Sequence, residues 1–260
     1  MMKNSLEIID FHTHPFSTPD ENICSHKSYC NMTLENTPDF LRQIGIRKIC
    51  GSVIRKCEGT WENIRSLNDT ALRLRDIYGE FYVPGFHVHP NFVKESCEEI
   101  KRMASHGVKL IGELVPYTHG WSDYSCDAFS SILDEATSYG MIVSFHSSGE
   151  DNMDKMVLSH PNTILVAAHP GEYQEFMRHM KRMSLSKNYY LDLSGYGIFR
   201  HGMLRHAIDE FGPERFLFGS DFPTCNPAMY VGSVLLDPLI TDCEKELIFA
   251  GNAKRLLGLK

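Results

Sequence analysis

The stretch Leu6-Glu7-Ile8-Ile9-Asp10, which runs on into Phe11-His12-Thr13-His14, is the first of eight short apolar runs. Each run is four to nine residues long, and most are apolar almost throughout rather than at alternate positions. Continuous apolar runs of this length are typical of parallel strands that are buried on both faces. The expected strands are Leu6–Asp10, Ile46–Ile54, Phe81–His87, Val108–Val115, Met141–Phe145, Thr163–Ala168, Tyr189–Leu193 and Phe216–Gly219.

Segments with helical spacing of apolar residues lie between these runs. The first, Ile64–Tyr78, is followed by Gly79, which suits the end of a helix. A second is expected to be capped by Asp127 and to end at Gly140. Its buried face would contain Phe129, Ile132, Leu133 and Ala136. A third stripe, expected to pack in the core, consists of Tyr173, Phe176, Met177, Met180 and Met183.

Eight strands that alternate with helices predict a parallel sheet of repeated strand–helix units, each about 32 residues long. Eight units of this length indicate an α/β fold with a single (β/α)8 TIM barrel over residues 1–260. An open doubly wound sheet is disfavoured because no glycine-rich phosphate-binding loop follows the first strand. The polar region from Phe16 to Asp39 is expected to form a long loop beside the catalytic mouth.

The composition excludes several classes of protein. A hydrophobic share of 42% and a charged share of 23% are ordinary for a soluble globular chain. The net charge of −7 disfavours nucleic acid and anionic membranes as partners, so a small-molecule substrate is expected. No stretch approaches the roughly 20 apolar residues of a membrane span. Eight cysteines without a CxxC pair, and no signal-peptide core over Met1 to Asp10, indicate a cytoplasmic protein with free thiols. The sequence leaves a homo-oligomer open.

The 13 histidines are unusually many, and two of them end the first strand. His12 and His14 are two positions apart, so in a strand their side chains point to the same face. One strand can supply two ligands to one cation in this way.

Four other strands also end on a side chain that can bind a metal. Because all strands of a barrel point their carboxyl ends toward the same mouth, these side chains are expected to meet there. A carboxylate such as Glu113 inside an apolar run is costly unless it is paired or bound to metal. For any one position an ordinary polar strand end would explain the residue, but six residues on five strands favour a metal site. The expected ligands are His12, His14, Glu113, His146, His169 and Asp221.

Several histidines together with carboxylates favour zinc, with manganese or iron as alternatives. Six ligands exceed what one tetrahedral ion needs, which favours two divalent ions that share a bridging hydroxide. One ion with catalytic residues left over stays open. A nearby cation makes hydroxide available near neutral pH, and Asp221 would accept its proton and pass it to the leaving group.

This constellation resembles the amidohydrolase superfamily of metal-dependent barrels. The segment from Gly219 to Pro223 and the tail from Gly251 to Leu259 are similar to its amidohydrolase-related branch, also called amidohydrolase 2. That branch includes decarboxylases and lactone hydrolases. The resemblance implies that His12, His14 and Asp221 bind the more buried metal and that His146 and His169 bind the second. It implies a bridging role for Glu113 and, if only one metal binds, a catalytic acid–base role for His169.

Glu113 departs from the mononuclear decarboxylase pattern and favours hydrolysis of a C–O or C–N bond in an ester, a lactone or an amide. A non-oxidative decarboxylase and, less favoured, a phosphodiesterase are the alternatives. Two arginines in loops after strands suggest that the small substrate is anionic, because guanidinium groups bind carboxylate or phosphate through paired hydrogen bonds. The expected substrate contacts are Arg55, His87, His89, Tyr117, His119, Tyr196 and Arg200. A second, weaker metal hypothesis is a loop site at Cys24, His26 and Cys30.

Overall fold

The computed structural model describes residues 6–19, 21–24, 32–197 and 200–260. His26 and Cys30 of the loop-site hypothesis lie outside these residues. Eight strands pair in chain order, and every neighbouring pair is parallel. They are β1 (Ile8–Asp10), β2 (Ile46–Gly51), β3 (Tyr82–Phe86), β4 (Leu110–Leu114), β5 (Ile142–His146), β6 (Ile164–Ala168), β7 (Tyr189–Asp192) and β8 (Phe216–Leu217).

The two ends of this sheet meet through backbone hydrogen bonds. The Phe11 N–H donates to the Phe218 carbonyl at 2.8 Å, and the Asp221 N–H donates to the His12 carbonyl at 2.9 Å. Thr13 and Phe222 form a parallel bridge just beyond the ends of β1 and β8. The predicted (β/α)8 barrel is therefore confirmed. Each predicted strand overlaps an observed one, and most observed strands are shorter by one or more residues at one or both ends.

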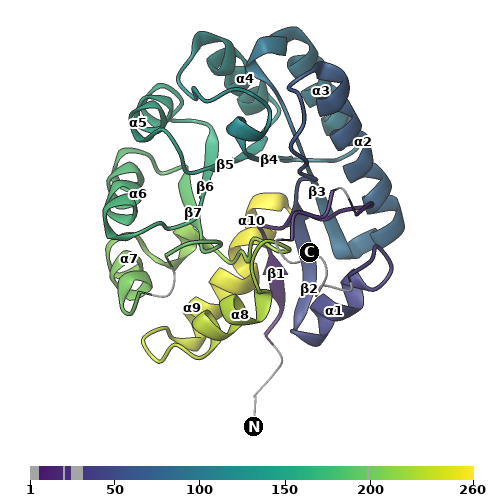
Figure 1. Ribbon diagram of the computed structural model, residues 1–260. Helices are drawn as coiled ribbons and strands as arrows, with labels where there is room; N and C mark the ends of the chain where they lie inside the picture. The colour runs from purple at the N-terminus through teal and green to yellow at the C-terminus, as the bar shows by residue number, and fades with distance from the viewer. Residues whose placement is uncertain (1–5, 20, 25–31, 198–199) are drawn as a thin grey trace.

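Helices α2 to α7 form an outer arc around the strands (Figure 1). The last helices follow β8 and lie beside β1, where the Phe218 N–H donates to the Ile248 carbonyl at 3.0 Å. The helices are α1 (Thr37–Gln43), α2 (Trp61–Tyr78), α3 (Val93–Ser105), α4 (Asp127–Ser138), α5 (Glu150–Ser159), α6 (Tyr173–Leu185), α7 (Met203–Phe211), α8 (Pro227–Leu235), α9 (Asp242–Glu246) and α10 (Asn252–Leu257).

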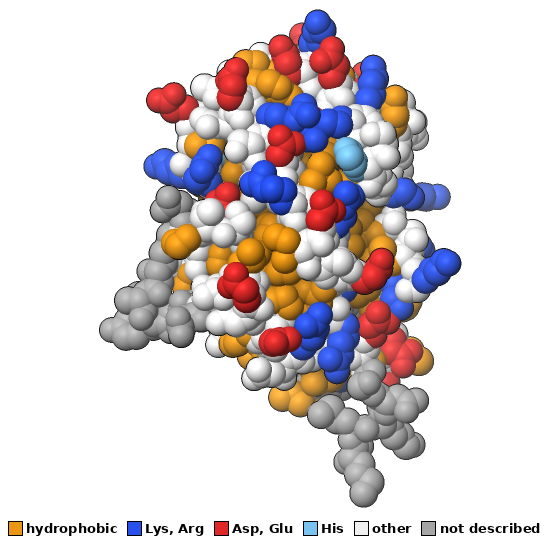
Figure 2. Space-filling view, turned by 90° about the vertical axis from the view of Figure 1, so that its right-hand side faces the viewer, with side chains coloured by type: hydrophobic (Ala, Val, Ile, Leu, Met, Phe, Trp, Pro, Cys, Tyr) orange, Lys and Arg blue, Asp and Glu red, His pale blue; other side chains and the backbone are white. Residues whose placement is uncertain are grey.

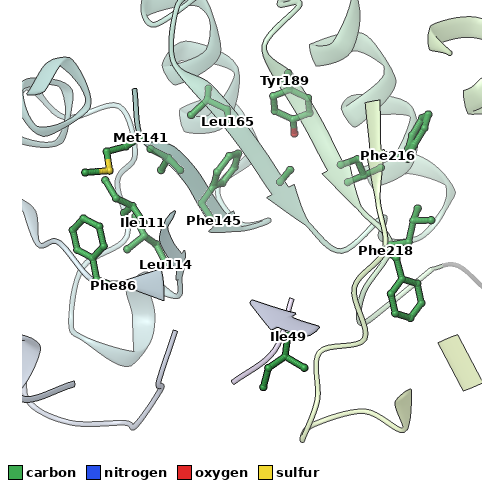
Figure 3. Packing of buried hydrophobic residues seen from close by; sticks show 14 of the residues in the cluster. Ile49, Phe86, Ile111, Leu114, Met141, Phe145, Leu165, Tyr189, Phe216 and Phe218 are labelled. Carbon is green, nitrogen blue, oxygen red and sulfur yellow. The ribbon is translucent and has the colours of Figure 1, made fainter. Parts of the chain in front are cut away.

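The main hydrophobic core joins side chains of the strands to the buried faces of the helices. Figure 3 shows part of it, with Ile111, Phe145, Leu165 and Phe216 projecting from successive parts of the sheet. A second buried cluster joins residues of the strands to Ala250 and the C-terminal helix. The shared core fixes the strand ends relative to one another, and those ends carry the candidate site.

Three details of the helices differ from the sequence expectations. Helix α4 has the predicted buried face, but Cys126 is its N-cap residue and Asp127 is its first residue. On α6 the expected core residues Tyr173 and Met177 are 60% and 37% exposed. They are four residues apart and lie along one edge of the apolar stripe, on the solvent side of the core residues Phe176, Met180 and Met183. Helix α1 begins at Thr37, inside the region expected to be loop.

On the face shown in Figure 2, basic and acidic side chains are interspersed with apolar ones rather than segregated by charge. Among the described residues, no helix combines the length and the apolar character that crossing a membrane requires.

Candidate metal centre

The six residues expected to bind metal come together at the carboxyl ends of the strands. Three of them form one compact group: the Nε2 atoms of His12 and His14 are 3.2 Å apart, and Asp221 Oδ1 lies 3.7 and 3.4 Å from them. A second compact group consists of Glu113, His146 and His169. Each group offers three nitrogen or oxygen donors within 4.8 Å of one another, which is a spacing that suits a divalent cation.

Glu113 joins the two groups, because its two carboxylate oxygens face different histidines. Oε2 lies 3.3 Å from the Nε2 atoms of both His12 and His14. Oε1 lies 3.0 Å from His146 Nδ1 and 3.5 Å from His169 Nε2. A carboxylate oriented in this way can give one oxygen to each of two neighbouring cations.

Glycines bring Glu113 and His12 into this position. Gly112 has a φ of +91°, and a Cβ on it would lie 2.1 Å from the Ser144 carbonyl oxygen of the next strand. The pairing of β4 with β5 is irregular between Ile111 and Leu114, so the chain turns Glu113 into the mouth. A Cβ on Gly219 would lie 2.7 Å from the His12 Cβ, so the close approach of the first and last strands also requires glycine.

Two of the candidate ligands have left-handed backbone conformations. The φ angles of His169 and Asp221 are +68° and +60°, and they are the only non-glycine residues with positive φ among those the structure describes. Such conformations cost free energy in a residue with a side chain, and they cluster at functional sites. His169 follows directly on β6, and Asp221 lies in the short segment after β8, so both are at the mouth of the barrel.

Hydrogen bonds at the far ring nitrogens fix which nitrogen of each imidazole faces the centre. His12 Nδ1–H donates to Asp192 Oδ2 at 2.8 Å, and His14 Nδ1–H donates to the Ser52 carbonyl at 3.1 Å. When the rings are neutral, the Nε2 atoms of both are therefore left with lone pairs toward the centre, as a metal ligand requires.

The sequence analysis missed two buried acids beside the centre. Asp192 ends β7 and Asp10 ends β1, and both are fully buried. Asp10 accepts hydrogen bonds from the Ser220 backbone N–H at 2.9 Å and from its hydroxyl at 2.5 Å. The signal that singled out Glu113, an acid within an apolar run, was present for both of these residues.

The acids and histidines of the centre shift one another's pKa values. Burial lowers the pKa of His14, but hydrogen bonds to Asp221 and Glu113 outweigh it and raise the pKa to about 9. The pKa of His12 is also raised against the effect of burial, because Asp192 and Glu113 attract the imidazolium. Burial raises the pKa of Glu113, yet the neighbouring histidines, His12 first, hold it well below its usual range. Buried acids that face paired imidazole nitrogens favour positive charge, so the donor set fits divalent cations.

Exposure differs between the two halves of the centre. The His12 and His14 side chains are 1% and 3% exposed, whereas those of His146 and His169 are 25% and 14% exposed. The Tyr117 ring meets the His146 ring edge-on, with centroids 5.4 Å apart, and is itself 63% exposed. The half that contains His146 is therefore the open side of the centre.

Three of the histidines expected to contact substrate form a separate buried cluster. His87 Nε2–H donates to the Val53 carbonyl at 2.8 Å, and its ring meets that of His119 at a centroid distance of 5.0 Å. His89 uses both ring nitrogens, since Nε2–H donates to the His119 carbonyl at 3.0 Å and Nδ1 accepts from the Asn91 N–H at 3.1 Å. Burial and the neighbouring His119 lower the pKa of His87 to about 3.

The remaining expected substrate contacts lie in loops around the mouth. Arg200 forms an ion pair with Glu172, so its guanidinium already has an acidic partner. Arg55 is half-buried and lies beside the Cys57 thiol. Tyr196 is 57% exposed, and its carbonyl accepts a hydrogen bond from the Gly171 N–H at 2.8 Å.

The family model Amidohydro_2, described as amidohydrolase, matches residues 9–259, which is almost the whole chain. The chain belongs to the amidohydrolase family. This membership confirms the resemblance seen in the sequence, and the family is one of enzymes that include hydrolases and decarboxylases. No curated protein matches this amidohydrolase at a significant level.

Solved structures share the fold of this amidohydrolase at low sequence identity. A 2,6-dihydroxybenzoate decarboxylase from Rhizobium has a TM-score of 0.76 at 16% identity, with 97% of this chain and 98% of that chain covered. A protein described as a probable 2-pyrone-4,6-dicarboxylic acid hydrolase from Acinetobacter baumannii, with citric acid bound, has a TM-score of 0.69 at 15% identity, covering 97% and 100%. A dihydroxybenzoic acid decarboxylase from a Polaromonas species, with bound manganese and an inhibitor, has a TM-score of 0.69 at 14% identity, covering 97% of each chain.

Proposed function

We propose that this amidohydrolase is a metal-dependent hydrolase that cleaves a C–O or C–N bond in a small ester, lactone or amide. Residues 1–260 would form one catalytic domain. His12, His14 and Asp221 would hold one divalent ion, and His146 and His169 would hold a second, with Glu113 between them. When bound, such ions supply an activated water near neutral pH and polarise the bond to be cleaved.

The orientation of Glu113 is the observation that carries the proposal. One of its oxygens faces the Nε2 atoms of His12 and His14 at 3.3 Å, and the other faces His146 Nδ1 at 3.0 Å. A centre for one ion would need only one of these groups. Histidine and carboxylate donors together suit zinc, and manganese, which one structural neighbour contains, is compatible with them.

Asp221 is proposed as the group that accepts a proton from the attacking water and passes it to the leaving group. Its Oδ1 points toward the histidines, and its Oδ2 lies 3.7 Å from the Cys225 thiol. It is the more exposed of the two acids that face the histidines, so it can reach a substrate that enters from the open side. His169 would serve as acid–base catalyst instead if only one ion is bound.

An anionic substrate remains part of the proposal, with Arg55 as its principal contact. The ion pair with Glu172 makes Arg200 a weaker candidate, because a substrate anion would have to displace a carboxylate. Tyr117 is well placed to contact a bound molecule, since it is exposed and packs edge-on against His146. The further substrate contacts in the proposal are His87, His89, His119 and Tyr196.

A non-oxidative decarboxylase is the second candidate. It is favoured by the shared fold of two dihydroxybenzoate decarboxylases, and it would need one ion rather than two. Carboxylates on aromatic rings would then be the substrate class.

Metal content and a matched substrate screen distinguish the two candidates. The purified protein should be loaded with Zn²⁺ or Mn²⁺, freed of excess ion, and its metal content measured by elemental analysis. It should then be assayed with lactones, esters and amides that carry a carboxylate, and with hydroxybenzoates. Two ions per chain and hydrolysis that a chelator abolishes would support the proposal. One ion per chain and release of CO₂ would overturn it in favour of decarboxylation.

A further inference from the structure

A serine just beyond the end of β7, Ser194, lies between the two halves of the proposed centre. Ser194 Oγ is 3.0 Å from His12 Nδ1 and 3.1 Å from His169 Nδ1. It is also 2.5 Å from Asp192 Oδ1, and all atoms of Ser194 are buried. The one hydroxyl therefore touches a histidine from each half and the acid beside them.

The directions of these hydrogen bonds follow from the donors that each group has. Asp192 accepts as a carboxylate at both oxygens, because Oδ1 also receives the Ser194 backbone N–H at 3.0 Å and Oδ2 faces a ring nitrogen that can donate to it. His12 Nδ1–H therefore donates to Asp192 Oδ2 at 2.8 Å, and the Ser194 hydroxyl donates to Asp192 Oδ1. Ser194 Oγ is then left with lone pairs, so it accepts from His169 Nδ1–H.

These hydrogen bonds leave the Nε2 atoms of both histidines without a proton when the rings are neutral. Those atoms face the two oxygens of Glu113, with His12 Nε2 at 3.3 Å from Oε2 and His169 Nε2 at 3.5 Å from Oε1. The nitrogens directed at the centre are thus the ones that the hydrogen bonds prepare as ligands.

His12, His169 and Asp192 by themselves could be read as a third place for a cation, since their donor atoms lie within 4.8 Å of one another. The Ser194 hydroxyl contacts all three at 2.5 to 3.1 Å and so fills the middle of that group. Asp192 is thereby a partner of the two histidines rather than a ligand.

The neighbouring glycine keeps His169 against this hydroxyl. A Cβ on Gly195 would lie 2.1 Å from His169 Nδ1, so no other residue type would let the ring come as close. The sequence Asp192-Leu193-Ser194-Gly195 therefore provides the acid, the hydroxyl and the space that the two rings need.

We infer that Asp192 and Ser194 are positioning residues that set the tautomer of one ligand in each half of the centre, Asp192 directly for His12 and Ser194 for His169. The inference rests on the proposed two-ion function. Loss of the Ser194 hydroxyl removes the acceptor of His169, whereas His12 keeps its bond to Asp192. The two ions should therefore respond unequally to the same substitution.

The test is Zn²⁺ binding to the metal-free protein, measured by calorimetry against a competing chelator, with no substrate involved. In Ser194→Ala the affinity of the binding step that depends on His169 should fall about 10- to 100-fold, and the affinity of the other step should change less. His169→Ala identifies which binding step belongs to His169. In Asp192→Asn at least one affinity should fall as far, because an amide cannot accept from both His12 and Ser194.

Ser130→Ala is the matched control, because Ser130 Oγ also contacts a histidine, His160 Nε2 at 3.0 Å, but on the outer helices. It should leave both affinities unchanged. In the Zn²⁺-loaded protein, ¹⁵N NMR should show a proton on Nδ1 of His12 and His169, and in Ser194→Ala the His169 signal alone should shift.

Each outcome bears on one of the two claims. Two ions in the wild type with unchanged affinities in folded Ser194→Ala would overturn the inference and leave the proposed function standing. Equal losses at both steps would also overturn it. A wild-type protein that binds fewer than two Zn²⁺ ions would overturn the two-ion function, and with it the unequal response.

Discussion

The chain contains two His-x-His motifs at strand ends, and the structure gives them opposite electrostatic character. His12 and His14 follow β1 and face Glu113 and Asp221, which raise the pKa of His14 to about 9. His87 and His89 follow β3 and face backbone carbonyls and another histidine, and burial lowers the pKa of His87 to about 3. The same motif at equivalent ends of two strands thus belongs either to a candidate cation site or to a neutral buried cluster, and the neighbouring acids decide which.

Neutralising Glu113 should do most to remove the electrostatic difference between the two His-x-His motifs. In Glu113→Gln both proposed ions lose a negatively charged ligand, so metal content should fall and turnover should drop on the order of 10⁴-fold or more. Elemental analysis and steady-state kinetics measure the two effects.

Glu99→Gln provides the comparison, because Glu99 is also buried but is bound to Arg102 and Asn68 on the outer helices. It should keep its full metal content. Full metal content in folded Glu113→Gln would contradict the bridging role.

The first motif should still bind metal when the proposed proton acceptor is made neutral. Asp221→Asn keeps an oxygen ligand near His14 but removes the basicity, so kcat should fall about 10²- to 10⁴-fold while ions remain bound. Kinetics on a substrate found in the screen, with metal analysis of the same sample, make the measurement. Full turnover of the metal-loaded variant would show that another group accepts the proton.

The two motifs should respond to pH in opposite directions in the metal-free protein. The pKa of His14 is raised from 6.5 to about 9, so its contribution to the free energy of unfolding is complete below pH 6.5 and is lost as the pH rises through 9. The pKa of His87 is lowered to about 3, so its contribution is complete above pH 6.5 and is lost as the pH falls through 3.

Urea unfolding in a chelating buffer from pH 3 to pH 10 tests this prediction. His14→Gln should flatten the alkaline side of the profile and His87→Gln the acid side. Addition of Zn²⁺ should reverse the alkaline trend, because metal binds the deprotonated imidazole. Identical profiles for the two variants would contradict the contrast between the motifs.

A substitution in the second motif should have the smallest effect and should not reach the metals. His89→Phe removes two buried hydrogen bonds, to the His119 carbonyl and from the Asn91 N–H, and should cost about 1–3 kcal/mol of stability. Denaturant unfolding measures the loss, and metal content should stay at the wild-type value. His206→Phe, at an exposed histidine on α7, should change neither quantity by a measurable amount. Loss of metal in His89→Phe would contradict this prediction and show that the His87–His89 cluster supports metal binding.

The amino-acid sequence alone determined the barrel, because eight apolar runs at regular spacing leave few other ways to bury strands on both faces. It also indicated which strand ends bring together side chains that can bind a metal, since the carboxyl ends of all strands of a barrel face one mouth. It could not show where the buried face of α6 ends, because Tyr173 and Met177 are as apolar as Phe176 and Met180 and differ only in what lies opposite them.

Only the tertiary structure decided how these side chains are paired. The two oxygens of Glu113 face different histidines because Gly112 lets β4 turn against β5, and no local pattern encodes that contact. Asp192 lies 180 residues from His12 in the chain and 2.8 Å from it in space, and Ser194 lies 25 residues from His169 and 3.1 Å from its ring. Residue types follow from the sequence, but charge states and hydrogen-bond partners depend on distances that folding sets between remote strands.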